Sequence, residues 1–161
     1  MCNAQGRGVS RRTHSDLTKA SPCWSPDGSR LIFAMEPGPQ LYVMSASGGM
    51  PQRVSYNIGT SYCAEPDWSR TNPDKVAFTM KVGPMYQIGV LDLSTRHGEQ
   101  VSHAPFYGVE PSWLPDGRHL VYTARTSTTS RVCILDTETG KSTPVSPVSF
   151  GPARQASVWS R

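Results

Sequence analysis

Histidine and cysteine are the residue types in this 161-residue chain that could serve as bases, nucleophiles or metal ligands. The histidines are His14, His97, His103 and His119, and we expect no aspartate or glutamate partner for any of them. His14 and His103 each lie ten residues before a tryptophan, which indicates a shared strand end rather than a metal site. The Gly-x-Ser-x-Gly, His-Glu-x-x-His and glycine-rich phosphate-loop motifs are absent from the sequence. We therefore predict no catalysis, no cofactor and no metal.

The cysteines, Cys2, Cys23, Cys63 and Cys133, are too far apart for a Cys-x-x-Cys motif. A zinc knuckle and a thioredoxin-type site are therefore excluded. We expect free thiols in or near strands, and a disulfide between two of the last three cysteines remains the alternative.

The charge is concentrated at the N-terminus. Arg7, Arg11 and Arg12 account for most of the net charge of +4, and the remaining 13 Lys and Arg residues face 12 Asp and Glu residues. A nucleic-acid surface should be broadly basic, so we predict no nucleic-acid partner. No apolar run approaches the ~20 residues of a membrane helix, which predicts no membrane insertion. The N-terminus also carries no apolar signal segment.

The tryptophans reveal an internal repeat. Trp24, Trp68, Trp113 and Trp159 are separated by 44, 45 and 46 residues, and Pro-Asp-Gly or a related turn sequence follows the first three. Asp27, Asp74 and Asp116 belong to these segments, which predicts turn residues rather than a catalytic acidic triad.

Short apolar segments follow each tryptophan at matching distances. They lie at residues 31–34, 76–79 and 120–123, then at 41–44, 88–92 and 132–136, and finally at 52–55, 100–103 and 143–146. No helical apolar period is present. Four strands in a period near 44 residues are typical of a β-propeller blade.

The repeat predicts an all-β fold with three four-stranded β-propeller blades at residues 21–56, 64–103 and 109–147. A basic segment, residues 1–20, would contain the outer strand of a preceding blade at 9–14. Residues 156–161 would form the innermost, closing strand of a further blade. Three blades cannot close a ring, so we expect either half of a six-bladed propeller or a homodimer that completes a six-bladed ring.

The repeated Pro-x-Trp-Ser-Pro-Asp-Gly segment, seen at residues 22–28, and the Leu-Tyr-Val-Met strand at 41–44 resemble the TolB β-propeller family. The resemblance covers about residues 9–161. It implies a non-catalytic periplasmic protein of the Tol–Pal cell-envelope system that binds the lipoprotein Pal. If Met1 is the true start, the missing signal peptide would instead indicate the cytoplasm.

The same resemblance implies that partners contact the loops that lead into the innermost strands. The matching positions are Thr18 to Ser21, Tyr62, Cys63, Ala64, Glu65, Tyr107, Gly108, Val109, Glu110, Arg154, Gln155 and Ala156. Tyr62 and Tyr107 occupy equivalent places and suit contact. Glu65 and Glu110 either add negative charge at the channel mouth or merely start their strands.

Propellers also occur in enzymes, so two alternatives stay open. The chain could belong to the propeller of a serine peptidase or of a metal-dependent polysaccharide lyase, or it could be an intracellular repeat scaffold. A hydrolase domain elsewhere in the protein would identify a peptidase.

Overall fold

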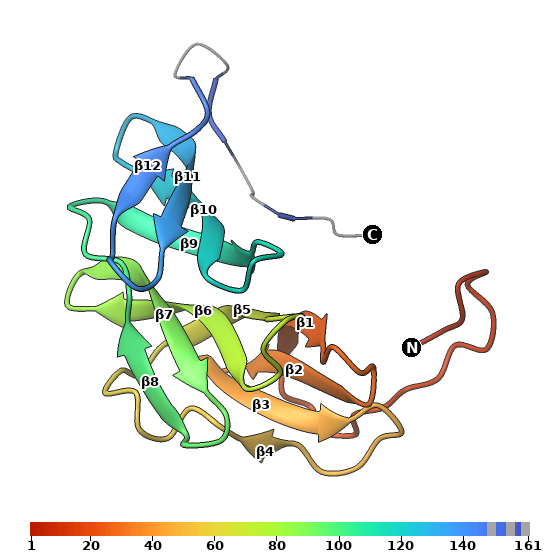
Figure 1. Cartoon of the computed structure of the whole chain (residues 1–161). Coiled ribbons are helices and arrows are strands. Elements are labelled where there is room, and N and C mark those ends of the chain that lie inside the picture. The colour runs from red at the N-terminus through yellow and green to blue at the C-terminus, as the bar shows by residue number, and fades with distance from the viewer. Residues whose placement is uncertain (148–150, 154–156, 159–161) are drawn as a thin grey trace.

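The computed structural model describes residues 1–147, 151–153 and 157–158. Within these ranges the regular structure consists of twelve strands in three four-stranded antiparallel sheets, and no helix is present. None of the described residues therefore forms a helix long and apolar enough to cross a membrane. Figure 1 shows the sheets following one another in chain order. The predicted all-β propeller architecture is confirmed.

Each sheet is a meander in which consecutive strands are neighbours. The first contains β1 (Lys19–Trp24), β2 (Arg30–Met35), β3 (Gln40–Ser45) and β4 (Gln52–Arg53). The second contains β5 (Cys63–Trp68), β6 (Lys75–Val82), β7 (Met85–Asp92) and β8 (His97–Gln100). The third contains β9 (Tyr107–Trp113), β10 (His119–Arg125), β11 (Ser130–Asp136) and β12 (Ser142–Pro144). The first strands lie side by side, because β1 contacts β5 and β5 contacts β9, so the three sheets are arranged as blades.

The aspartates of the repeat close turns. The Asp27 carboxylate accepts hydrogen bonds from the Ser29 N–H at 3.1 Å and the Ser25 hydroxyl at 2.6 Å. Asp116 accepts bonds from the N–H groups of Arg118 and of His119, the first residue of β10. Gly28 and Gly117 follow with φ of 70° and 69°, which side chains rarely adopt. The predicted turn role of Asp27 and Asp116 is therefore confirmed.

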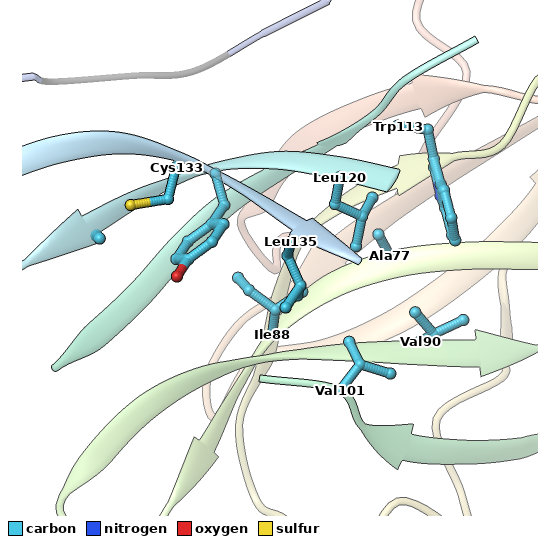
Figure 2. Packing of buried hydrophobic residues seen from close by; sticks show 10 residues of the cluster. Ala77, Ile88, Val90, Val101, Trp113, Leu120, Cys133 and Leu135 are labelled. Carbon is cyan, nitrogen blue, oxygen red and sulfur yellow. The ribbon is translucent and has the colours of Figure 1, made fainter. Parts of the chain in front are cut away.

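The core lies between the blades. One apolar cluster joins Ile32 and Leu41 of the first blade to Trp68 and Phe78 of the second. A second cluster, which includes Cys133, joins the second blade to the third; Figure 2 shows Ala77, Ile88, Val90 and Val101 together with Trp113, Leu120 and Leu135. Each blade is thus stabilised by its neighbour.

The tryptophans report which blade faces are covered. Trp68 and Trp113 are 2% and 7% exposed, whereas Trp24 is 47% exposed. The sequence predicts burial of each ring against a neighbouring blade. The prediction is wrong for Trp24, because no described residue supplies a blade on that side of β1. Trp159 lies outside the described residues.

The expected outer strand at residues 9–14 is not formed. The Ser10 N–H donates a hydrogen bond to the Met1 carbonyl at 2.8 Å, and Arg12 Nη1 donates to the Ser47 carbonyl at 3.1 Å. A strand needs a neighbouring strand to pair with. Residues 9–14 pair with none of the twelve described strands, so they remain irregular.

Candidate functional site

The meander brings several predicted contact residues to one end of the blades. Consecutive strands of an antiparallel sheet run in opposite directions. The first and third strands of a blade therefore begin at the edge of the sheet where the second strand finishes. The Lys81 N–H at the end of β6 accordingly donates a hydrogen bond to the Tyr62 carbonyl just before β5, at 3.2 Å. The β6–β7 hairpin, the loops before β5 and β9, and the end of β10 therefore lie together.

Three tyrosines meet at this end. The ring centroids of Tyr62 and Tyr86 are 5.0 Å apart with an interplanar angle of 61°, and those of Tyr86 and Tyr107 are 5.9 Å apart at 46°. Edge and tilted arrangements of this kind are favourable for aromatic pairs. The rings line a pocket of about 340 Å³, here called the tyrosine pocket, together with Glu65, Thr79, Val109 and Arg125.

Glu65 and Glu110 sit at β-bulges where the pairing register of the first strand shifts. Their φ angles are 53° and 56°, and Ser21, the equivalent residue of β1, has 51°. Non-glycine residues adopt this conformation at a cost and need support from the surrounding structure. The same unusual backbone therefore recurs in all three described blades at the predicted contact position.

The Glu65 carboxylate supplies that support across the blade boundary. Its Oε2 accepts a hydrogen bond from the Glu110 N–H at 2.9 Å and from the Thr79 hydroxyl at 2.6 Å. Glu110 instead forms an ion pair with Arg125, with Oε2 3.1 Å from Nη2. Both glutamates thus have structural bonds, and Glu65 fixes the left-handed bulge of the next blade.

The electrostatic environment of Tyr62 is negative. Burial raises the pKa of its phenol, and the charges of Glu65 and Glu36 raise this pKa further. Tyr62 is therefore a neutral phenol at physiological pH, with carboxylates nearby.

The predicted contact residues divide by accessibility. Tyr62, Tyr107, Glu65 and Glu110 are partly or fully accessible and lie around or beside the tyrosine pocket. Cys63, Ala64 and Gly108 are buried, so their side-chain positions are closed to a partner, and Val109 is buried but lines the pocket. Arg154, Gln155 and Ala156 lie outside the described residues.

Gly108 has a packing role. A Cβ at this position would lie 3.2 Å from the Tyr122 ring and 3.3 Å from the Ile88 side chain. The missing side chain lets β9 approach the core closely.

Tyr86, Thr79 and Arg125 belong to the pocket but were not expected there. Tyr86 lies in a Gly-Pro hairpin that reads as a simple turn. Meander topology was the available signal, because it places the β6–β7 turn and the end of β10 beside the loops before β5 and β9.

A second groove follows the innermost strands. It is lined by residues of β1, β5 and β9 and has a volume of about 340 Å³. Glu65, Asp67 and Glu110 supply its carboxylates, while Pro22, Pro66 and Pro111 supply its apolar surface. Burial raises the pKa of Asp67, whose carboxylate Oδ2 accepts the Trp113 N–H at 2.7 Å.

The thiols among the described residues are free, as predicted. Burial raises the pKa of Cys23 to about 11 and that of Cys63 to about 12. No group of three or more His, Cys, Asp or Glu side chains within the described ranges is arranged to hold a metal ion. His119 does have a carboxylate partner, contrary to expectation: its Nδ1 lies 2.6 Å from Asp116 Oδ2, because the turn before β10 brings the two side chains together.

Two curated relatives carry related names. The "Protein TolB homolog" of Chlorobium luteolum is 27% identical over 142 residues, which cover 87% of this chain and 31% of the relative. The "Tol-Pal system protein TolB" of Chromobacterium violaceum is 31% identical over 67 residues, which cover 42% of this chain and 16% of the relative. The chain thus spans less than a third of the relatives that it matches.

Solved structures share the fold. A putative TolB from Agrobacterium tumefaciens matches 81% of this chain and 50% of its own, with a TM-score of 0.72 and 18% identity. An oligogalacturonate lyase from Vibrio parahaemolyticus matches 83% of this chain and 42% of its own, with a TM-score of 0.61 and 18% identity. An acylaminoacyl peptidase from Pyrococcus horikoshii matches 78% of this chain and 24% of its own, with a TM-score of 0.59 and 14% identity. The propeller architecture is thus found in enzymes as well.

The family model described as the TolB beta propeller domain matches residues 1–161, the whole sequence. Together with the three blades and the repeated bulges, this match shows that the chain belongs to the TolB β-propeller family.

Proposed function

We propose that the chain is a non-catalytic binding module that holds a protein partner at the tyrosine pocket. The observation that carries this proposal is the convergence of Tyr62, Tyr86 and Tyr107 from two blades around one accessible pocket. Tyrosine is enriched among the residues that dominate binding energy, because its ring is large, rigid and amphipathic.

The partner that fits best is a Pal-like lipoprotein. The support is family membership and the name of the Chromobacterium relative, which assigns that protein to a Tol–Pal system. We further propose that it acts in the periplasm, as the resemblance to the TolB family implies. Both statements concern the function of longer relatives and are proposals for this chain.

A binding measurement tests the proposal. Isothermal titration calorimetry would combine the purified chain with the lipid-free soluble domain of a Pal-type lipoprotein from the same genome. We expect saturable binding that Tyr107→Ala weakens at least about tenfold, in the range of a hot-spot residue. Tyr107 is 37% exposed, so its truncation should leave the fold intact.

Tyr56→Ala is the matched control. Tyr56 is 58% exposed and does not line the tyrosine pocket. Its removal should leave the dissociation constant unchanged. Absence of binding by the wild-type chain, or equal losses in the two variants, would refute the proposed site.

We propose that the binding unit is a single chain rather than two copies closed into a ring. The Val158 N–H donates to Ser112 Oγ at 3.2 Å, as the Trp68 N–H does to Cys23 Sγ at 3.3 Å. Residues 157–158 thus lie beside β9, on the side where a second copy would need to put its β1. Light scattering should give a mass near the 17.6 kDa of the chain, and a stable dimer would contradict this expectation.

A further inference from the structure

We propose that the tyrosine pocket receives an organic cation, namely the ammonium or guanidinium group of a basic side chain on the partner. The inference rests on the proposed function, since it specifies the partner chemistry at the same site. It concerns the Tyr62, Tyr86 and Tyr107 rings and the carboxylate of Glu65.

The rings form walls at different angles. Tyr86 is tilted by 61° to Tyr62 and by 46° to Tyr107, so the three rings that line the pocket differ in orientation instead of forming a flat stack. Tyrosine faces carry negative electrostatic potential and attract a cation within about 6 Å of the ring centre. Several aromatic faces around one pocket are the arrangement that recognises alkylammonium groups.

The chain uses this interaction elsewhere. The Arg30 guanidinium carbon lies 4.9 Å from the centroid of the Trp68 ring, and that of Arg53 lies 5.2 Å from the centroid of the Tyr56 ring. The fold thus already places basic groups over aromatic faces at two other positions.

The charge of the pocket also favours a cation. The bonds to Glu65 Oε2 come from the Thr79 hydroxyl and a backbone N–H, both neutral donors, so they leave its negative charge uncompensated. Arg125 also lines the pocket, and the carboxylate of Glu110 offsets its charge. Lys81, paired with Tyr86 in the hairpin, is exposed and is not part of the lining.

Two small molecules of the same shape test the charge preference. Choline carries a trimethylammonium group, and 3,3-dimethylbutan-1-ol replaces it with a neutral tert-butyl group. Binding to the purified chain would be followed by the shifts of tyrosine ring protons in NMR titrations. We expect choline to bind with a millimolar dissociation constant and the neutral alcohol to bind about fivefold more weakly, as an accessible cation–π site predicts.

Variants locate the site. Tyr86→Leu removes the central ring and should abolish the difference between the two compounds, whereas Tyr86→Phe keeps an aromatic face and should preserve most of it. Tyr56→Leu, outside the pocket, should bind both compounds like the wild type. Thermal unfolding of each variant would verify that the fold is retained.

Three outcomes would overturn the proposal: equal binding of the two compounds, no binding of choline at 100 mM, or a choline response that survives Tyr86→Leu. The first would indicate an apolar pocket. The Pal-type titration separates the two proposals, because partner binding without choline binding refutes only the cation preference. Choline binding without partner binding refutes only the proposed function.

Discussion

The carboxylate of Asp67 in the second blade accepts a hydrogen bond from the backbone N–H of Trp113 in the third, at 2.7 Å. The Trp113 indole N–H donates a second bond, to the Asp67 carbonyl, at 3.2 Å. The residue before each tryptophan repeats the first bond, since Cys23 Sγ accepts the Trp68 N–H and Ser112 Oγ accepts the Val158 N–H. Neighbouring innermost strands are therefore joined through one recurring position.

Replacing Asp67 tests this joint. Asp67→Ala removes the acceptor and leaves the Trp113 N–H, which lies beside a nearly buried ring, without a partner. We expect a loss of about 1–3 kcal/mol in the free energy of unfolding, measured by urea denaturation. Asp67→Asn, which keeps an acceptor, should lose less. Asp74→Ala in the exposed turn should be nearly neutral, and equal losses at positions 67 and 74 would contradict the role of the joint.

A fall in pH should lower the contribution of some aspartates to the free energy of unfolding and raise that of others. Hydrogen bonds from Ser94, Thr95 and Lys75 lower the pKa of Asp92, so the unfolded chain binds more protons at this residue. Its contribution to stability is complete above about pH 4 and is lost as the pH falls below that value. Asp92→Asn should therefore flatten the decline of unfolding free energy between about pH 5 and pH 2.

Asp67 provides the contrasting case. Burial raises its pKa, so the folded chain binds more protons there and its contribution to stability falls as the pH rises through about 4. Asp67→Asn should make the decline in acid steeper than in the wild type. Urea titrations at several pH values would compare the slopes, and a change of the same sign in both variants would disprove the assignment.

The thiols should differ sharply in reactivity. Cys2 is exposed, whereas burial raises the pKa of Cys23 to about 11 and of Cys63 to about 12, and Cys133 is buried with a raised pKa. Thiolates are the reactive species, so we expect one rapidly modified thiol per native chain at pH 8 and four in urea. Ellman's reagent measures both counts. Two rapidly modified thiols in the native chain would show that the bond between Cys23 and the Trp68 N–H opens in solution.

Trp68 and Trp24 form a matched pair for measuring how much a neighbouring blade contributes to the stability of the fold. Trp68→Ala should cost about 3–5 kcal/mol, because the ring is 2% exposed within the cluster between the first two blades. Trp24→Ala, at the equivalent position but 47% exposed, should cost much less. Urea denaturation compares the two, and similar losses would mean that the first blade is covered in solution.

The strand pattern could be predicted from the sequence because it depends on local residues. Apolar segments such as residues 31–34 and 120–123 lie in β2 and β10, and Asp27 and Asp116 close the turns before these two strands. The prediction of a strand at residues 9–14 is wrong, because strand formation there depends on a pairing partner and not only on the segment itself.

The candidate site was predicted only in part. The repeat position identified Tyr62 and Tyr107 but also included Cys63 and Ala64, which are buried. Tyr86 and Arg125 reach the pocket from other strands, and a search restricted to one loop of the repeat cannot find them. The bond between Glu65 and the Glu110 N–H joins residues 45 positions apart, so only the three-dimensional arrangement reveals it.

Trp68, Trp113 and Val158 each donate to the residue that precedes a tryptophan, yet the three acceptors are a thiol, a carboxylate and a hydroxyl. Sulfur is the weakest acceptor of the three. The row of innermost strands is therefore uniform in shape but graded in chemistry, and we expect the hydrogen bond at Cys23 to be the weakest of the three.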